Sequence, residues 1–323
     1  MSVLSRPYFH DEAAAFQHVE EILWPAGPVC HHCGSMEQHY ALKGVRSKPS
    51  KKNPHGVERI GLYKCKDCRG QFTVRMGTIF EESHLPLHKW LKAIHLMASS
   101  KKGISAHQLN RVLETTYKTA WFLAHRIREA MRSDDFTPLG GNGKFVEADE
   151  TYIGRLKGVP YSRGTAHKNT VLTLVERGGR ARSFHIENAS VAKIVPIVRA
   201  NIAKESALMT DEARQYVRVG GEFASHGRVE HGAFEYGRTE TNADGERVKI
   251  NTNTVEGFYS IFKRGMKGVY QHCAEHHLHR YLAEFDFRYS NRIAMGVDDG
   301  VRALLTLKAV KGRRLTYRRP VAV

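Results

Sequence analysis

The chain has 323 residues, of which 41% are hydrophobic, so it is long enough for two or three domains with buried cores. Its 50 Lys and Arg residues outweigh 33 Asp and Glu residues and give a formal net charge of +17. This charge favours a polyanionic partner, and nucleic acid fits it better than an anionic membrane surface. The chain has no run of 18 apolar residues and no signal-peptide pattern, so we expect a soluble intracellular protein.

Four of the five cysteines form two C-x-x-C pairs, Cys30 with Cys33 and Cys65 with Cys68, with 31 residues between the pairs. Each pair offers two thiolates to one tetrahedral ion, and this spacing predicts a structural Zn²⁺ site. A redox role is the alternative, but neither pair lies between a strand and a helix. The two histidines inside the first pair are expected at the surface, because four cysteines already complete the site.

We assign residues 1–82 to a helix followed by a zinc ribbon. Apolar residues at helical spacing predict the helix at about 11–23, ending before Pro25. The segment 43–59, between the two cysteine pairs, is rich in Lys, Arg, Ser, Pro and Gly. It is typical of a solvated loop, and a loop of this composition can also lie along a phosphate backbone.

Helical periodicity also predicts helices at 87–99, 105–113 and 117–131, with Ser105 as an N-cap. The short break at 114–116 is typical of a helix-turn-helix, in which the last helix reads DNA. A three-helix bundle without a DNA role has the same pattern. The neighbouring zinc ribbon and the basic charge favour the DNA-binding interpretation.

We therefore assign 83–135 to a helix-turn-helix domain, followed by a linker of Asp, Pro and Gly residues at 133–144. On the last helix, the side chains expected to contact DNA are Lys118, Arg126 and Arg128.

The pattern changes after the linker, because residues 145–153 alternate as a strand does, with Glu147, Asp149 and Thr151 on one face. A short apolar strand later in the chain ends at Asp211. The order of elements predicts an α/β fold with a ribonuclease H-like mixed sheet and flanking helices. In such a sheet Asp149 and Asp211 lie side by side and can share metal ions. The predicted elements are strands at 145–153, 168–177, 181–186 and 207–210, and a helix at 191–202.

The stretch 251–264 predicts an amphipathic helix with Glu256 and Lys263 on its polar face. Two helical turns separate these residues by roughly 10 Å, so a carboxylate can hold a metal while the ammonium binds a neighbouring phosphate. The alternative is a capping box, in which Asn253 caps the helix and Glu256 bonds back to its backbone N–H.

Residues 218–250 are Gly-rich and polar, and we interpret them as an insertion that includes a hairpin turn at Asp244-Gly245. His226 and His231 in this insertion face either the active site or DNA, or are ordinary surface residues. The remaining pattern predicts a helix at 275–291. We assign 136–300 to the catalytic domain and 301–323 to a basic, loosely held C-terminal tail.

Together these features resemble the DDE-type transposases of bacterial insertion sequences, in the Merlin-related group with an N-terminal zinc ribbon. The resemblance covers nearly the whole chain. The motifs that carry it are Glu147-Ala-Asp149-Glu-Thr, Met209-Thr-Asp211, Asn253-Thr-Val-Glu256-Gly-Phe-Tyr-Ser-Ile-Phe-Lys263-Arg-Gly and Tyr281-Leu-Ala-Glu284-Phe-Asp-Phe-Arg288.

The resemblance implies that Asp149, Asp211 and Glu256 bind Mg²⁺ or Mn²⁺ and that Lys263 contacts the transposon end. Some relatives have Asn as the third residue, so Asn253 stands as the alternative to Glu256. The implied partners are the terminal inverted repeats and the target DNA. A homodimer or higher oligomer would act on DNA in the bacterial cytoplasm, associated with the nucleoid.

Two other functions remain open on the sequence. The first is a non-catalytic regulator that binds DNA through its zinc ribbon and helix-turn-helix. The second is a ribonuclease H-like nuclease without strand transfer. A regulator would have no reason to keep three carboxylates at strand and helix positions that converge.

Overall fold

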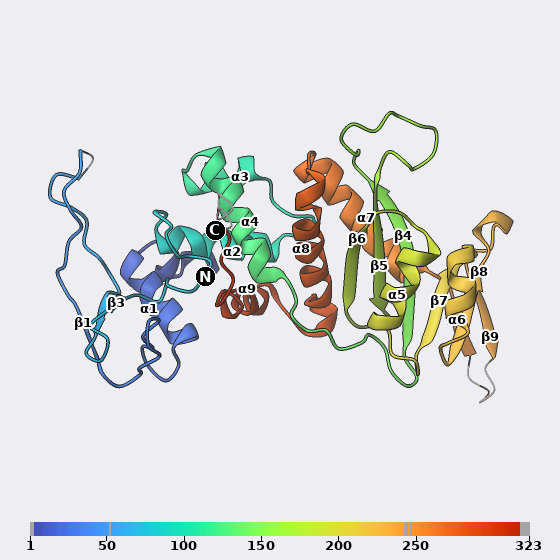
Figure 1. Ribbon diagram of the computed structural model, residues 1–323, viewed down its shortest axis with the longest axis horizontal. Helices are drawn as coiled ribbons and strands as arrows, with labels where there is room; N and C mark the ends of the chain where they lie inside the picture. Colours follow the sequence, from blue (N-terminus) through green and yellow to red (C-terminus); the bar gives the residue numbers. More distant parts are fainter. Residues whose placement is uncertain (1–2, 52, 242–244, 246, 317–323) are drawn as a thin grey trace. The chain divides into compact units, whose positions relative to one another are not determined.

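The computed structural model describes residues 3–51, 53–241, 245 and 247–316. The chain divides into two compact units, drawn with their elements in Figure 1. The ribbon unit comprises residues 1–100, 104–131 and 299–323, and the sheet unit comprises residues 101–103 and 132–298. Within the described part of the chain, no helix combines the length and apolar character needed to cross a membrane.

Helix α2 (Leu87–Ser99) is the centre of the ribbon unit, because four other α-helices of the unit pack against it. Trp90, Ile94 and Met97 on this helix are almost completely buried. The zinc ribbon is a three-stranded antiparallel sheet in the order β1-β2-β3. The other elements of the unit are η1 (Val3–Ser5), η2 (Pro7–Phe9), α1 (Glu12–Leu23), β1 (His39–Ala41), β2 (Tyr63–Cys65), β3 (Gln71–Phe72), α3 (Ala106–Leu113), α4 (Tyr117–Met131) and α9 (Asp299–Lys308).

The helix starts of the ribbon unit lie where local side chains satisfy the first backbone N–H groups. Asp11 caps α1 by accepting a hydrogen bond of 2.7 Å from the backbone N–H of Ala14. Ser105 and Gln108 form a reciprocal capping box at the start of α3, which confirms the predicted N-cap. Glu114 ends α3 in the left-handed region, at φ 50°, and α4 begins three residues later. The predicted helices and the turn between them are therefore present.

The C-terminal segment differs from the predicted loose tail, because its first part is helix α9 and its next part is bound to the ribbon unit. The guanidinium of Arg302 is buried and donates to the carbonyl of Ala98 at 2.8 Å. Past the helix, the backbone N–H of Ile79 donates to the carbonyl of Val310 at 3.2 Å. The basic composition predicts a solvated tail. Arg and Lys side chains can, however, pack their aliphatic parts against the protein while their charged groups bind backbone carbonyls. The arginines at 318 and 319 lie outside the described residues.

The sheet unit contains a five-stranded mixed sheet in the order β6-β5-β4-β7-β8. Strands β4, β5 and β6 pair antiparallel, while β7 pairs parallel with both β4 and β8. This arrangement confirms the predicted ribonuclease H-like fold class. The strands are β4 (Phe145–Ile153), β5 (Asn169–Glu176), β6 (Ala181–Ile186), β7 (Ala207–Asp211) and β8 (Ser225–Val229).

Two apolar cores lie on opposite faces of this sheet. Ala148 and Leu172 pack with Ile194 of helix α5 in one core, and Val171 packs with Phe262 of helix α7 in the other. Because successive strand residues point to opposite faces, one strand feeds both cores. The helical elements of the unit are α5 (Val191–Asn201), η3 (Arg214–Tyr216), α6 (Val217–Gly220), η4 (His231–Ala233), α7 (Asn253–Gly265), η5 (Met266–Tyr270), η6 (Glu275–His277), α8 (Leu278–Ser290) and η7 (Ile293–Met295).

The segment 218–250 is not simply an insertion, because β8 within it is the fifth strand of the central sheet. This edge strand is polar, so it has no apolar run that would predict a strand from the sequence. Strands β9 (Arg238–Thr241) and β10 (Arg247–Ile250) form a separate antiparallel pair. The turn residue Asp244 lies outside the described residues.

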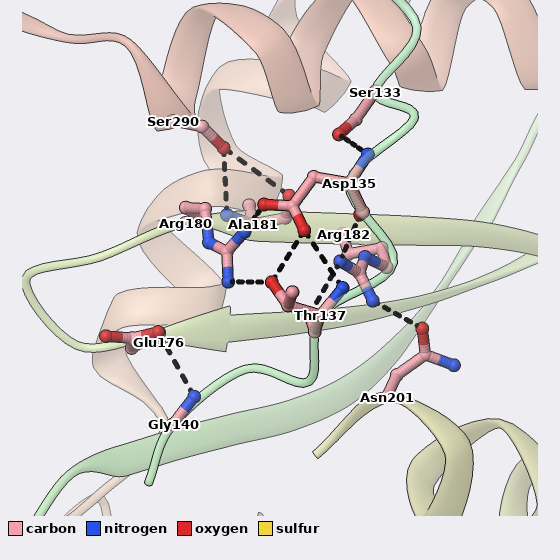
Figure 2. A network of polar contacts seen from close by, with 10 residues as sticks. All are labelled: Ser133, Asp135, Thr137, Gly140, Glu176, Arg180, Ala181, Arg182, Asn201 and Ser290. Atoms are coloured by element: carbon pink, nitrogen blue, oxygen red, sulfur yellow. Dashed lines mark hydrogen bonds and ion pairs between the residues drawn. The ribbon is translucent and has the colours of Figure 1, made fainter. Parts of the chain in front are cut away.

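The segment after α4 is fastened to the sheet unit by a network of polar contacts, shown in Figure 2. The carboxylate of Asp135 forms an ion pair with Arg180, and Arg182 donates to the backbone carbonyl of Asp135 at 2.7 Å. Further along, the backbone N–H of Gly140 donates to Glu176 at 3.1 Å. This segment is therefore a structured part of the sheet unit, although its composition is typical of a linker.

Candidate active site and metal centres

The four cysteines of the ribbon converge on one point. The sulfur atoms of Cys30 and Cys68 are 3.6 Å apart, those of Cys33 and Cys65 are 3.7 Å apart, and all four lie within 4.8 Å of one another. A tetrahedral ion with Zn–S bonds of about 2.3 Å holds its sulfurs ~3.8 Å apart. The Cys₄ cluster therefore fits zinc.

Asp149 lies in the middle of β4, the central strand of the sheet. Burial, and then the charges of Glu150 and Asp211, raise the pKa of Asp149 to about 7. The neighbouring Glu150 has a different environment, because its carboxylate accepts a hydrogen bond of 2.6 Å from the hydroxyl of Tyr216. Two adjacent carboxylates thus occupy opposite sides of one strand, and only Asp149 lies on the side of α7.

Asp211 is the last residue of β7, the parallel neighbour of β4. Glu147 pairs with Met209 in this ladder, so the register continued by two residues places Asp149 opposite Asp211. The backbone N–H of Ala213 donates to the carboxylate of Asp211 at 3.0 Å and orients it. Burial raises the pKa of Asp211, as expected for a carboxyl group among other acids.

Glu256 lies in the first turn of α7, and its charge is among those that raise the pKa of Asp149. The side chain of Glu256 is 46% exposed, and the hydroxyl of Thr252 donates to it at 3.0 Å. The alternative capping box is absent, because α7 begins with Thr252 as its N-cap and that residue makes no side-chain cap hydrogen bond. Glu256 is therefore free of the backbone role that competed with a metal-binding role.

The start of α7 is capped instead by Glu147, which is fully buried in β4. Its carboxylate accepts hydrogen bonds from the backbone N–H groups of Thr254 at 2.7 Å and Val255 at 2.9 Å. The guanidinium of Arg177 donates to the same carboxylate at 2.6 Å and also donates to the carbonyl of Asn251 at 2.8 Å. We call these contacts the Glu147 clasp, and they fix the helix that carries Glu256 to the strand that carries Asp149.

Lys263 lies two turns after Glu256 on the same helix, as the sequence spacing predicts. Its ammonium nitrogen is 5.9 Å from the centroid of the Tyr259 ring, within the range of a cation–π contact. Tyr259 in turn is buried and donates its hydroxyl to the backbone carbonyl of Asp149. Tyr259 thus lies in contact with both Lys263 and strand β4.

The two candidate metal centres differ in how tightly their ligands gather. Among the described residues, the Cys₄ cluster is the only set of three or more Cys, His, Asp and Glu residues whose ligand atoms all lie within 4.8 Å. A site for two ions about 4 Å apart needs a wider spread, because some ligands bind only one ion. The oxygen donors of Asp149, Asp211 and Glu256 suit hard ions such as Mg²⁺ and Mn²⁺.

The proposed DNA-reading helix α4 presents fewer charges than its sequence suggests. Lys118 in the first turn is exposed, but Arg126 is only 5% exposed and Arg128 only 2% exposed. The burial of Arg126 and Arg128 therefore disfavours the predicted contact of these two side chains with DNA. The second half of α4 is enclosed by other helices of the ribbon unit, including α2 and α9.

Arg126 has a structural role instead. Its guanidinium donates to the carbonyl of Glu81 at 2.7 Å and lies 5.5 Å from the centroid of the Trp90 ring. Burial, and then the charges of Arg314 and Arg75, lower the pKa of Arg126 to about 10. Helical periodicity predicts one buried face, but α4 is buried on several faces around Arg126, so the sequence pattern does not reveal that this side chain is buried.

Glu147 and Glu212 had no clear sequence signal as contributors to the acidic site, and for His231 the sequence left the active site, DNA and the surface open. Glu147 was placed on the same face as Asp149 by strand alternation, but nothing indicated that it caps a helix. Glu212 and His231 meet at the end of β7, where the carboxylate of Glu212 accepts the backbone N–H of His231 at 2.9 Å. Contacts between residues so far apart in sequence appear only in the folded chain.

Comparison with known protein families agrees with this geometry. Residues 138–290 match the ISXO2-like transposase domain, and residues 10–71 match the transposase zinc-ribbon domain. The chain thus carries an insertion-sequence transposase domain and a transposase zinc ribbon, which confirms the resemblance seen in the sequence. These two domains imply a polynucleotidyl transferase-type role and DNA binding.

A curated relative extends the match over most of the chain. A protein of Halobacterium salinarum, described as an uncharacterized protein in transposable element ISH50, is 28% identical over 298 residues. The match covers 87% of this chain and 91% of the relative. The similarity therefore includes both the ribbon unit and the sheet unit.

Proposed function

We propose that this protein is the transposase of an insertion sequence, and that it cleaves and joins DNA strands with Asp149, Asp211 and Glu256 as metal ligands. The observation that carries the proposal is the convergence of these carboxylates from β4, β7 and α7 in a domain matched to transposases. Burial is the main cause that raises the pKa of Asp149 and of Asp211, and raised pKa values are typical of carboxyl groups gathered to hold cations. Glu256 is favoured over Asn253 as third ligand because its charge acts on Asp149.

The side chains have distinct roles in this proposal. Divalent ions bound here would activate water or a 3′-hydroxyl and stabilise the leaving oxygen. The hydrogen bonds to Asp211 and Glu256 orient their carboxylates before any ion binds. Lys263 contacts a phosphate of the transposon end, where its charge offsets the charge of the backbone. The chemistry needs no covalent bond between protein and DNA.

The ribbon unit binds the terminal inverted repeats in this proposal, with the first turn of α4 entering the major groove. In helix-turn-helix proteins, the N-terminal residues of the second helix contact base edges. Tyr117, Lys118 and Thr119 are exposed in this turn, while the rest of α4 is mostly buried. Two copies of the chain act together, because an element has two ends to process.

Substitution of the three carboxylates tests the catalytic proposal. We expect Asp149→Asn, Asp211→Asn and Glu256→Gln each to slow strand cleavage in Mg²⁺ or Mn²⁺ by roughly 100- to 1000-fold, since each removes several kcal/mol of transition-state stabilisation. The substrate is duplex DNA that carries the inverted repeats flanking the gene. Binding of this DNA should persist, and circular dichroism should show an unchanged fold.

Asn253→Ala is the matched control, because it alters the same helix turn without removing a carboxylate. If Asn253→Ala abolishes cleavage and Glu256→Gln does not, Asn253 is the third ligand. If all four variants cleave like the wild type, the proposal of a metal-dependent enzyme fails. Cleavage without joining of the freed 3′ end would define a nuclease and not a transposase.

The DNA-binding part of the proposal predicts a steep dependence of affinity on salt, because a chain of charge +17 releases several counterions when it binds. Lys118→Ala should lower the slope of log affinity against log salt by about one. Lys308→Ala removes an equal charge from another helix of the ribbon unit and serves as the control. A slope that Lys118→Ala leaves unchanged would exclude this residue as a phosphate contact.

A further inference from the structure

The structure brings one histidine to the acidic site that the proposed mechanism does not use. His231 follows β8 in the short helix η4, and its Nε2 atom is 3.6 Å from the carboxylate of Glu256. This atom is buried and has no hydrogen-bond partner among the described residues. A buried nitrogen without a partner is costly in a folded protein, so its position calls for a ligand.

We propose that His231 is a further metal ligand and that Nε2 binds the same divalent ion as Glu256. The proposal rests on the proposed function, because it assumes that the carboxylates hold a divalent ion. It adds a nitrogen donor to a site whose other donors are oxygens. His231 then acts as part of the catalytic centre and not as a surface residue of an insertion.

The distance between the two side chains supports this assignment. A separation of 3.6 Å between Nε2 and the Glu256 oxygen is longer than a normal hydrogen bond. Two ligands that bind one ion at about 2.1 Å each lie roughly 3.0–3.6 Å apart, depending on the angle between the bonds. The pair is therefore spaced as co-ligands are spaced.

The backbone holds His231 in this place. The carboxylate of Glu212, the residue after Asp211, accepts the backbone N–H groups of His231 at 2.9 Å and Gly232 at 3.1 Å. Strand pairing also places Val229, two residues before His231, beside Asp211. These contacts attach the histidine to the end of the strand that carries Asp211, so its position does not depend on a loose loop.

The neighbouring His226 provides a contrast within the same segment. Its Nε2 atom lies 2.9 Å from the hydroxyl of Thr210, so this nitrogen is already engaged inside the sheet. The ring of His231 instead lies 5.6 Å from the ring of Tyr236, which limits its rotation. Of these two histidines, only His231 therefore presents a nitrogen to the acidic site.

A nitrogen ligand changes which ion the site prefers. Mg²⁺ and Ca²⁺ bind almost entirely to oxygen, whereas Mn²⁺ accepts imidazole more readily and ranks lowest of the transition metals in general affinity. We therefore expect His231 to favour Mn²⁺ over Mg²⁺ in this site. Loss of the imidazole should reduce that preference more than it reduces Mg²⁺ binding.

The test uses the full-length, untagged protein with its zinc in place, loaded with one equivalent of Mn²⁺. Pulsed electron paramagnetic resonance detects nitrogen directly bound to Mn²⁺. We expect the wild type to show this nitrogen coupling, and ¹⁵N labelling of histidine to change its frequency. His231→Gln should lose the coupling and weaken Mn²⁺ binding by about tenfold or more, while His226→Gln keeps both.

The outcomes separate this inference from the proposed function. If wild-type protein binds Mn²⁺ through Asp149 but shows no nitrogen coupling, His231 is not a ligand and the carboxylate site stands. If the coupling persists in His231→Gln, the nitrogen comes from another residue and the inference is overturned. If the wild type binds no Mn²⁺ at all, both this inference and the proposed metal-dependent function fail. The wild-type spectrum decides the question even if a variant folds poorly.

Discussion

The Cys₄ cluster and the acidic site are both able to hold metal ions, yet they are built in opposite ways. The cysteines come from two short C-x-x-C segments, and their sulfur atoms all lie within 4.8 Å of one another. The carboxylates come from a central strand, its parallel neighbour and a helix start. In the first site the ligands are gathered locally, and in the second the whole fold brings them together.

The two sites therefore differ in whether metal binding or the folded chain supplies the free energy that assembles the ligands. A small ribbon with few buried residues depends on its metal for stability, because the ion replaces a larger core. The acidic site opposes the fold, since burial and mutual repulsion raise the pKa of Asp149 to about 7. The sheet unit offsets this cost with contacts such as the Glu147 clasp. Metal should therefore determine the fold of the ribbon but not the fold of the sheet unit.

Loss of zinc should have the largest effect on stability. Cys65→Ser removes one of four ligands, and we expect the zinc content to fall well below one equivalent and residues 30–72 to lose their structure. Metal analysis and hydrogen exchange of the ribbon measure both effects. The helices and sheet of the remaining chain should keep their protection.

Removal of Mg²⁺ by dialysis against Mg²⁺-free buffer, with the thiolate-bound zinc left in place, is the complementary experiment. The melting temperature of the sheet unit should change little, because the fold positions the acidic ligands without metal. Unfolding of the sheet unit on removal of Mg²⁺ would contradict the contrast between the two sites. A ribbon that keeps its fold in the zinc-free Cys65→Ser variant would also contradict the contrast, because it would show that zinc is not needed there.

The Glu147 clasp offers a second way to test the contrast, through the fold's contribution to the acidic site. Glu147→Gln removes the buried charge that accepts the Thr254 and Val255 N–H groups and pairs with Arg177. We expect cleavage to slow by roughly 10- to 100-fold, because a small displacement of a catalytic group is costly. Amide exchange at Thr254 and Val255 should also accelerate.

Glu176→Gln is the matched control for this variant. Glu176 is also buried in the sheet and pairs with Lys144 at 2.8 Å, but it holds the segment before β4 and not helix α7. A similar loss of stability without faster exchange at α7 is expected. If both variants slow cleavage equally, the clasp acts only through general stability.

Much of the fold was predictable because it follows from local periodicity. The helix starting near residue 253 and the strand 145–153 have strong apolar patterns, and the structure has them within a few residues of the predicted bounds. The zinc site was also predictable, because each C-x-x-C pair by itself places two sulfur atoms close enough to bind one ion. The acidic residues Asp149 and Asp211 could be placed together because the order of strands in this fold class puts their strands side by side.

The remaining features depend on contacts that no local pattern contains. Strand β8 is short and polar, so only its pairing with β7 identifies it as part of the sheet. Arg126 was assigned to DNA because charge on a helix usually means solvent, but α4 is covered on several sides. The backbone contacts of Glu212 with His231 join residues 19 positions apart in sequence. Each of these is a tertiary effect that overrides a local preference.

Asp286 provides the smallest and most quantitative test, because it is a buried carboxyl group outside the acidic site. It accepts hydrogen bonds from the backbone N–H of Ser183 at 2.7 Å and from the hydroxyl of Ser183 at 2.6 Å. Burial raises its pKa from 3.8 to about 7, even though these hydrogen bonds oppose the shift. Its contribution to stability is therefore fully present below pH 3.8 and is lost as pH rises towards and through 7.

Asp286→Asn keeps the shape of the side chain and removes its titration. Relative to the wild type, the variant should gain on the order of 2 kcal/mol in the free energy of unfolding between pH 5 and pH 8, measured in urea. The pH dependence of zinc binding is common to both proteins and cancels in the difference. Asp135→Asn should show no change with pH in this window, because hydrogen bonds from Thr137 lower the pKa of Asp135 and its contribution to stability is lost only as pH falls below 3.8. A difference that does not change with pH would mean that Asp286 stays ionised, and that burial alone does not explain why the carboxyl groups of the acidic site resist losing their protons.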